Sequence, residues 1–482
     1  MDQFASILLA FPPRDNVRVV DNETYHNLAV LHVKRLDKVL KEQTRDLVAC
    51  SSQLFSIVDP AVNSLSYLTL LHATLFPSPT SSLTEESILE KVVTFMMTFD
   101  GRQCRYAGPV LLDLMEAIGN GRLLPPSVAV ESLAAAILTL DPTGSLFTSS
   151  HLLLAKLAFE TDNMEPALPV IDETIVFYPR LDPHDLTQAL CDPALPPLAY
   201  ISRDTGLTGP LKSSAVLEYD LLCGMMYCER RDWTKARGSF ERAATYPTKT
   251  EGCSKIMVEA FKKWVLVNLL AEGRHSVAPP YLSAGIIRTF EILADPYLSL
   301  ATAFTTDDVR QLKLEADNNA HLWIEDGNLG LVREVVASYQ KWRVISLHHT
   351  YAKISISEIR EQTKSAETGL PLQKDEDVEE LLHDMIAAGM LKGAIETNTN
   401  GTKFLVFLPP SLHLSDKEYE EEMSRAVEKL NKLKSISNDT HRRFATSKEY
   451  IRWAMRDAGR EGRRDAYAED HAQEDEDLMT AN

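Results

Sequence analysis

The chain has 482 residues, with 69 acidic and 50 basic side chains and a formal net charge of −19. Because nucleic-acid affinity depends largely on Lys and Arg that neutralise phosphates, this balance disfavours nucleic acid as a partner. The six cysteines show no CxxC spacing, the N-terminus lacks a basic signal region, and no stretch suits a bilayer. We therefore expect reduced thiols, no membrane contact, and a location in the cytoplasm and nucleus.

Residues 1–146 are predicted to form N-terminal helical repeats. Apolar residues recur there at three- and four-residue spacing, as in the long helical pattern that contains Leu36, Leu40 and Leu47. Residues 147–342 are predicted to continue as a tetratricopeptide-like helical solenoid, because a helical hairpin cannot bury its apolar face alone and must stack on its neighbours. The alternative is an irregular helical bundle.

The clearest repeat lies at 217–247, where small and aromatic residues occupy the offsets of the tetratricopeptide pattern. Gly224 and Ala236 would let two helices approach closely, while Tyr227 and Phe240 fill the space beside them. A second stretch, 151–179, matches more weakly. The Pro- and Gly-rich segment 179–213 predicts an irregular loop, either a contact site or an insertion.

Residues 343–410 are predicted to form a winged helix. Ser355 and Glu358 have the spacing of a capping box, and Gly389 suits the left-handed end of the third helix. Two strands joined by an Asn/Gly turn follow. Many winged helices bind DNA. This segment, however, contains only seven basic residues and ten acidic ones, and its third helix begins with the acidic sequence "KDEDVEELLHD", which phosphates would repel. The pattern favours a module for protein contact.

The second strand of this hairpin is the predicted partner-binding strand. It is apolar at five consecutive positions, where a strand with one wet face would alternate. We expect a neighbouring subunit to cover one side, with strand-to-strand pairing as one possible mode. The alternative is that the C-terminal helix or the segment "PPSLHL" folds back over it. The strand residues are Phe404, Leu405, Val406, Phe407 and Leu408.

Residues 411–456 are predicted to form a C-terminal bundle helix, and 457–482 a disordered acidic tail. Apolar residues alternate at four- and three-residue spacing for about two heptads, which is typical of a helix that packs on partner helices. Packing back on its own domain is the alternative. This predicted partner-binding seam comprises Tyr419, Met423, Ala426, Leu430 and Leu433.

A search for catalytic motifs finds none. HExxH, GxSxG and a phosphate-binding loop are absent, and the pair Gly119/Gly121 lacks the third glycine of a dinucleotide site. No Ser/His/Asp or Cys/His set stands out. The sequence therefore predicts a protein that is not an enzyme, with no catalytic, cofactor-binding or metal-binding residues and no cofactor.

A mainly α chain with a solenoid, a winged helix and a C-terminal helix resembles the PCI-domain proteins. These occur in the proteasome lid, the COP-nine (constitutive photomorphogenesis) signalosome and a translation initiation factor complex. The resemblance covers roughly 147–408 and is closest to the family of the third signalosome subunit. It is carried by segments such as "LEYDLLCGMMYCERRDWTKARGSFERAATYPT", "DGNLGLVREVVASYQKWRVISLHHTYAKISISEI" and "VEELLHDMIAAGMLKGAIE".

The resemblance implies a non-catalytic scaffold. The signalosome removes the ubiquitin-like modifier Nedd8 from cullins, and its isopeptidase uses a zinc-bound HxH…D motif on a different subunit; this chain has no HxH. The implied partners are other signalosome subunits, through winged-helix edges and a C-terminal helical bundle, and indirectly the cullin–RING ligases. A proteasome-lid subunit and a nucleic-acid-binding PCI protein of the messenger-export type are the alternatives.

Overall fold

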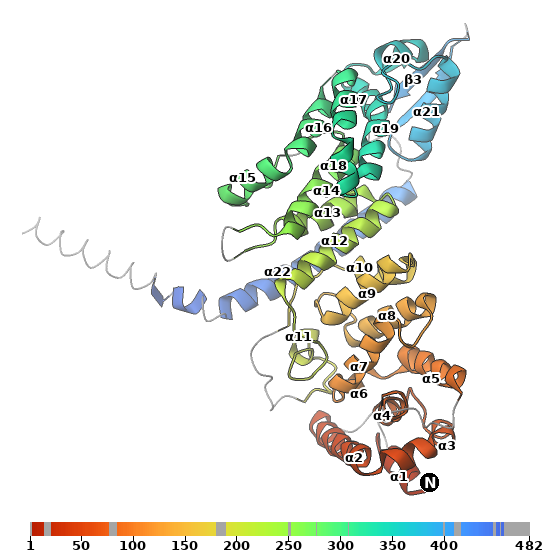
Figure 1. Ribbon diagram of the computed structural model, residues 1–482, viewed down its shortest axis with the longest axis vertical. Coiled ribbons are helices and arrows are strands. Elements are labelled where there is room, and N and C mark those ends of the chain that lie inside the picture. The colour runs from red at the N-terminus through yellow and green to blue at the C-terminus, as the bar shows by residue number, and fades with distance from the viewer. Residues whose placement is uncertain are drawn as a thin grey trace, which may run out of the picture. The chain divides into compact units, whose positions relative to one another are not determined.

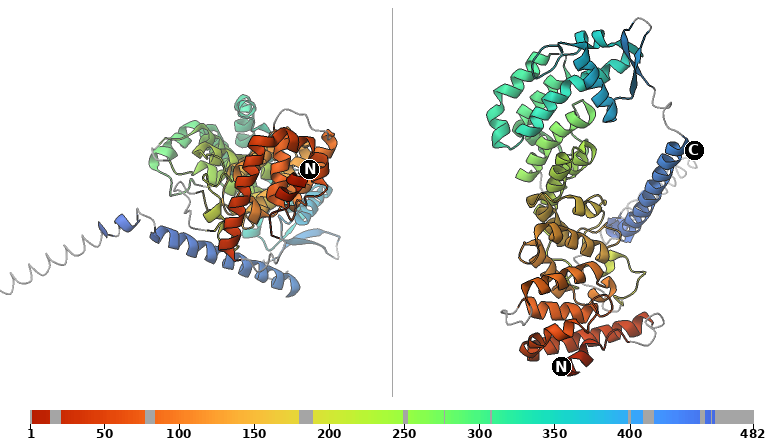
Figure 2. Two further views of the ribbon diagram at one scale, coloured as in Figure 1. Left: turned by 90° about the horizontal axis from the view of Figure 1, so that it is seen from below. Right: turned by 90° about the vertical axis from the view of Figure 1, so that its right-hand side faces the viewer.

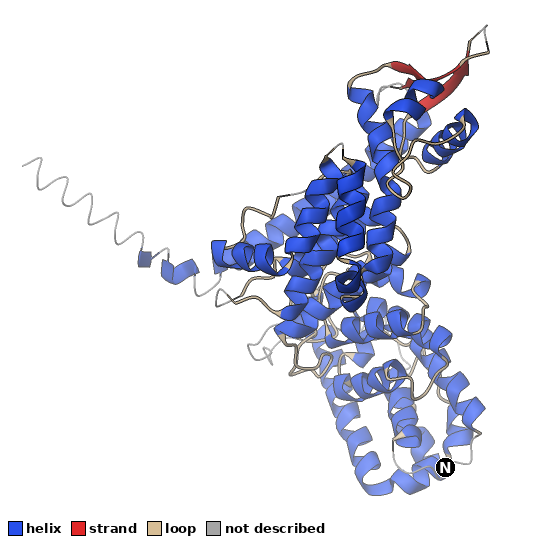
Figure 3. Ribbon diagram, turned by 45° about the horizontal axis from the view of Figure 1, so that its top comes forward, coloured by secondary structure: helices blue, strands red, loops and turns tan. Residues whose placement is uncertain are grey.

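The computed structural model describes residues 2–13, 21–76, 84–179, 189–248, 252–275, 277–306, 308–398, 401–408, 416–446, 450–453 and 455–456. The chain divides into two units, Met1–Phe407 and Leu408–Asn482. Helices dominate both, and the strands of the described residues form one three-stranded sheet (Figure 3). The first unit confirms the mainly α class, with helical repeats followed by a winged helix.

The first part of this unit is a stack of helices (Figure 1). Their apolar side chains share one core. Its elements are α1 (Asp2–Leu8), α2 (Asn22–Ala49), α3 (Ser51–Phe55), α4 (Ser64–Leu75), α5 (Glu85–Thr98), α6 (Gly101–Cys104), α7 (Gly108–Gly119), α8 (Pro126–Leu140) and α9 (Ser149–Glu160). Side chains cap several of these helices; Thr84, for example, accepts a hydrogen bond from the backbone N–H of Ser87 at the start of α5.

The predicted repeat at 217–247 is a helical hairpin of α12 (Ser213–Glu229) and α13 (Trp233–Ala244). Gly224 allows the two helices to meet, because a Cβ there would lie 2.4 Å from the ring of Phe240. Ala236 and Phe240 are fully buried. Asp220 stands where the repeat usually has Trp. Its buried carboxylate accepts a hydrogen bond from the Arg242 guanidinium (Nε–Oδ1 2.8 Å), so the departure is compensated locally.

The weaker repeat at 151–179 forms only its first helix in full. After α9 come a 3₁₀ turn at Glu165–Ala167 and the four-residue helix α10 (Leu168–Ile171). The chain then becomes extended, and Phe177 bridges to Leu146. Backbone pairing therefore replaces the expected second helix: the N–H of Phe147 donates to the carbonyl of Phe177 at 2.9 Å.

The Pro-rich segment is packed into the first unit from residue 189 onward. It contains the short helix α11 (Pro197–Tyr200), and Tyr200 is buried. The Tyr200 hydroxyl donates to the carbonyl of Leu140 at 2.7 Å, and the Arg105 guanidinium lies 3.5 Å from the centre of its ring. Arg105 also donates to the carbonyl of Leu190 at 2.8 Å. The described part of this segment is thus a packed internal connection, here called the brace, rather than an exposed loop.

Further helices carry the array to the winged helix (Figure 2). They are α14 (Lys255–Glu272), α15 (Ala284–Leu293), α16 (Asp295–Thr305), α17 (Val309–Asn318), α18 (Ala320–Glu325) and α19 (Leu329–Ser346), and a 3₁₀ turn follows at Leu347–His349. Between α14 and α19, Lys263 is buried and donates to Asn328 (Nζ–Oδ1 2.6 Å), while the amide of Asn328 donates to the Tyr297 hydroxyl at 2.8 Å. The buried charge is therefore hydrogen-bonded.

The winged helix has a core of its own. It consists of β1 (Lys353–Ser355), α20 (Ile356–Gln362), α21 (Asp375–Ala387), β2 (Gly393–Thr397) and β3 (Lys403–Phe407), with strand order β1-β3-β2 and antiparallel pairing throughout. The capping box at Ser355 and Glu358 is confirmed. Gly389 has φ 71°, and Met390 N–H donates to the carbonyl of Met385, so α21 ends in the predicted glycine cap.

The second unit contains α22 (Asp416–Thr446), a helix of 31 residues. Its composition is polar apart from a narrow apolar row. Residues 409–415, which include the whole segment "PPSLHL" considered as a cover for the hairpin, and the predicted tail at 457–482 lie outside the described residues.

Candidate interaction surfaces

The two sides of β3 have different environments. Leu405 and Phe407 are buried in the winged-helix core, whereas Phe404, Val406 and Leu408 are half-buried. Because side chains alternate along a strand, Leu405 and Phe407 pack in the core, and the residues that alternate with them lie on the outer side of the sheet.

The outer side of the sheet also carries charge. Lys353 and Glu396 form an ion pair (Nζ–Oε2 2.8 Å), and the Lys353 ammonium lies 5.0 Å from the centre of the Phe404 ring. The outer surface of the sheet is thus a small apolar strip bordered by an ion pair without net charge.

The expectation of strand-to-strand pairing through β3 is wrong. β3 is the central strand: Val406 is opposite Lys353 of β1 on one side and Ala394 of β2 on the other. Both rows of backbone hydrogen-bonding groups are therefore occupied within the module. Contact with a partner at β3 can involve only its side chains, while β1 and β2 provide the sheet edges.

In addition to Lys353, two basic residues of the winged helix form ion pairs with carboxylates. Lys403 pairs with Glu379 (Nζ–Oε2 2.6 Å), and Arg360 pairs with Asp375 (Nη1–Oδ1 2.9 Å) at the start of α21. The first turn of α21, the helix that would enter a DNA groove, carries three acidic residues. These ion pairs make the cations less available to phosphate groups. Together with the excess of acidic residues, they disfavour DNA binding by the winged helix.

The predicted seam lies on α22. Tyr419, Met423, Leu430 and Leu433 are 56%, 47%, 65% and 52% exposed, and Ala426 is also exposed. Four- and three-residue spacing places all five on one face of the helix. A row of large apolar side chains in water is unfavourable, since burial of each leucine is worth about 1.5–3 kcal/mol.

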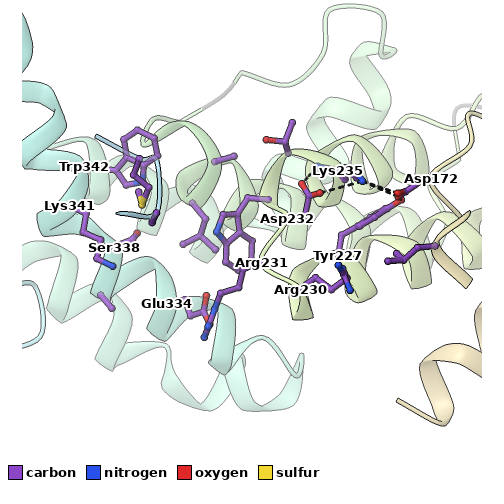
Figure 4. Close-up of a pocket in the computed structure, with 18 residues that line it drawn as sticks. Asp172, Tyr227, Arg230, Arg231, Asp232, Lys235, Glu334, Ser338, Lys341 and Trp342 are labelled. Atoms are coloured by element: carbon purple, nitrogen blue, oxygen red, sulfur yellow. Dashed lines mark hydrogen bonds and ion pairs between the residues drawn. The ribbon is translucent and has the colours of Figure 1, made fainter. Parts of the chain in front are cut away.

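A groove of about 1110 Å³ opens on the first unit between α12, α13, α14, α19 and the end of α21 (Figure 4). Its charges largely neutralise each other. Lys235 pairs with Asp172 at 3.0 Å, and Arg231 pairs with Glu334 at 3.0 Å. The groove leaves no local signal in the sequence, because its lining comes from segments more than 100 residues apart.

The two ends of the groove differ in character. At one end the Tyr227 hydroxyl donates to Asp172 (2.7 Å), and burial together with this carboxylate raises the pKa of Tyr227. At the other end Trp342 packs on Gly273, where a Cβ would lie 2.3 Å from the indole. Gly273 has φ 67° and ends α14, so both its conformation and its contact favour glycine. The groove has mixed polarity and no reactive set of side chains.

Two buried histidines serve packing. His32 Nε2 lies 2.8 Å from Ser66 Oγ, and His151 Nδ1 accepts a hydrogen bond from the backbone N–H of Thr148 (3.2 Å). Burial lowers the pKa of each to about 4, so both are neutral near pH 7. Among the residues that the structure describes, no three His, Cys, Asp or Glu side chains are grouped to hold a metal ion. None of the described helices is long and apolar enough to cross a bilayer.

Comparison with known proteins identifies the family. Residues 23–286 match the family model for the N-terminal helical repeats of COP9 signalosome complex subunit 3. The chain is 39% identical to COP9 signalosome complex subunit 3 of Neurospora crassa over 496 aligned positions, which cover 100% of this chain and 99% of that protein. It is 29% identical to the protein of the same name from Emericella nidulans, with 83% and 84% covered. The chain therefore belongs to the family of COP9 signalosome complex subunit 3.

Proposed function

We propose that this chain is a non-catalytic scaffold subunit of a signalosome that removes Nedd8 from cullins and so regulates cullin–RING ubiquitin ligases. It acts in the cytoplasm and nucleus. The observation that carries the proposal is the exposed apolar seam of α22, in a chain that matches a signalosome subunit family along its whole length. A helix of this kind gains stability by packing on helices of other subunits.

The outer side of β3 is the second proposed contact. Phe404 and Val406 supply apolar area there, and a neighbouring subunit would cover it through side chains. The cullin–RING ligases are indirect partners, through the assembled complex. The family match favours the signalosome over the proteasome lid, and the ion pairs of the winged helix disfavour the nucleic-acid alternative.

The test is genetic complementation. A strain that lacks this chain should accumulate Nedd8-modified cullins, and the wild-type gene should restore the normal level, as measured by immunoblot. The double variant Leu430→Glu/Leu433→Glu should fail to restore it, because charge in the seam prevents association. The purified chain alone should release no Nedd8 from a modified cullin.

The matched control is Ser424→Glu/Ser435→Glu, which adds the same charge on the opposite face of α22. It should complement like the wild type. Unchanged cullin modification in the deletion strain would count against the signalosome role. Full complementation by the leucine double variant would instead refute the seam as the point of assembly.

A further inference from the structure

The outward face of α2 carries a row of cations. Lys34, Lys38 and Lys41 recur at four- and three-residue spacing, and Arg45 is also exposed, just beyond the kink at Gln43. These four residues form the basic row of α2. At 3.6 residues per turn and 1.5 Å per residue, the three lysines fall within about 60° of arc and the whole row extends about 16 Å.

The other face of α2 fixes the direction of the row. Tyr25, His32, Leu36 and Val39 are buried, on the side of α2 that faces away from the three lysines. α2 packs on α1, α3 and α4 at the N-terminal end of the first unit (Figure 1). The basic row therefore cannot turn inward without breaking the core.

The basic row forms no ion pair within the part of the chain that the structure describes. None of its four cations forms an ion pair or a side-chain hydrogen bond with any other residue that the structure describes. By contrast, Arg237 pairs with Glu272 on neighbouring helices. Five basic and two acidic residues lie in 34–45, within a chain whose net charge is −19. This local excess of positive charge is therefore available to an external anionic group.

The surroundings of the row indicate the kind of anion. Leu31, on the same side one turn before Lys34, is 50% exposed, and an apolar side chain of a partner can cover it. The carboxylates of Asp37 and Glu42 interrupt the row, which favours a partner with separate, spaced negative charges over a continuous phosphate backbone. An α-helix with carboxylates at four- and three-residue spacing would place a negative charge opposite each lysine.

We propose that the basic row of α2 binds an acidic amphipathic α-helix of another protein. The site lies in the N-terminal repeats and shares no residue with the contacts proposed above for the winged helix and α22, so it does not depend on them. Exposed ion pairs are individually weak and are screened by salt. The association should accordingly be modest, sensitive to ionic strength and dependent on Leu31 for part of its affinity.

Fluorescence anisotropy with the full chain tests the proposal. The probe is a synthetic helical peptide of about five turns, with Glu at four- and three-residue spacing and Leu one turn before the first Glu. Lys34→Glu/Lys38→Glu/Lys41→Glu should weaken binding at least tenfold, and Leu31→Ser should weaken it several-fold. The same peptide with Gln in place of Glu should not bind, and raising NaCl from about 50 to 300 mM should weaken binding strongly.

The control variant is Lys255→Glu/Arg288→Glu/Arg310→Glu, which reverses three exposed cations on α14, α15 and α17 and changes the net charge equally. It should bind like the wild type. Equal weakening by both triple variants, or no binding by the wild type, would overturn the proposal. Tighter binding to a 20-base-pair duplex DNA or to phosphatidylserine-containing vesicles, lost in the α2 triple variant, would also overturn it in favour of a general polyanion site. Thermal melts establish that each variant is folded.

Discussion

The α12–α13 hairpin and α22 carry similar apolar spacing but have opposite environments. In the hairpin, Ala236, Phe240 and Ala243 are fully buried against neighbouring helices. In α22, Leu430 and Leu433 are more than half exposed. The hairpin brings its own partner helix within a short turn, whereas α22 is a single long helix. Apolar periodicity thus predicts that a helix will pack, while the number of helices nearby in sequence indicates whether it packs within its own chain.

The largest difference in stability is expected when a glutamate is introduced into the α12–α13 hairpin and, separately, into α22. Phe240→Glu should destabilise the first unit by at least about 4 kcal/mol, because it removes a buried ring and buries a carboxylate. Leu430→Glu should change the free energy of unfolding by less than about 0.5 kcal/mol, since the side chain is exposed. Urea unfolding followed by circular dichroism measures both. A large loss of stability in Leu430→Glu would show that α22 packs on its own chain.

A similar contrast is expected within β3. Phe407→Lys should destabilise the winged helix by about 3–5 kcal/mol, because Phe407 belongs to its small core. Val406→Lys should leave the module folded and yet prevent assembly, because Val406 lies on the outer side of the sheet. Limited proteolysis of the winged helix, together with co-purification of other subunits, separates the two effects. If both variants unfold, or if both assemble normally, the assignment of the two sides is wrong.

A smaller effect tests the close helix approach in the hairpin. Gly224→Ala should cost about 2 kcal/mol, because its Cβ would meet the Phe240 ring at 2.4 Å. Gly238→Ala, on the facing helix α13, should instead stabilise by up to about 1 kcal/mol, since only the end of the Arg242 side chain lies near its Cβ, at 3.8 Å. Equal effects of the two alanines on the unfolding midpoint would contradict the packing described here.

The effect that is smallest near neutral pH is a pH dependence of the helical array. Burial lowers the pKa of His32 and His151 to about 4 from the ordinary 6.5, so the unfolded chain binds protons first as the pH falls. Stability is therefore full above pH 6.5 and decreases between pH 6.5 and 4, by about 1.4 kcal/mol per histidine at pH 5.5. Replacing both histidines with Leu should make the melting temperature depend less on pH in that range. His321→Gln, at an exposed position, should not change this dependence.

Sequence predicted the features that depend on local pattern. The α12–α13 hairpin was recognisable because close helix packing restricts Gly224 and Ala236 to small residues. The ends of α20 and α21 followed from the capping box at Ser355 and the glycine at 389. The spacing of the seam predicted a single face on α22, and the structure places those residues on an exposed face; their partners remain a prediction.

Features that depend on distant contacts were not predictable in this way. A run of five apolar residues cannot show which alternate side chains of β3 face the core. The central position of β3 in the sheet depends on its pairing with β1, about 50 residues earlier. The brace formed by the Pro-rich segment depends on Arg105 and Tyr200, which meet only in the folded unit. The groove between α12 and α19 likewise arises from tertiary packing and leaves no local signal.

Hydrogen exchange tests the central proposal most directly, namely that α12 and α13 bury their apolar faces within this chain, whereas α22 buries its apolar seam only when it joins other subunits. In the isolated chain, amides of 213–244 should exchange slowly and those of 416–446 rapidly. In the purified signalosome, protection of 416–446 should rise by at least about tenfold, as expected for a helix buried at an interface, with 213–244 unchanged. Equal protection of 416–446 in the isolated chain and in the complex would contradict the account.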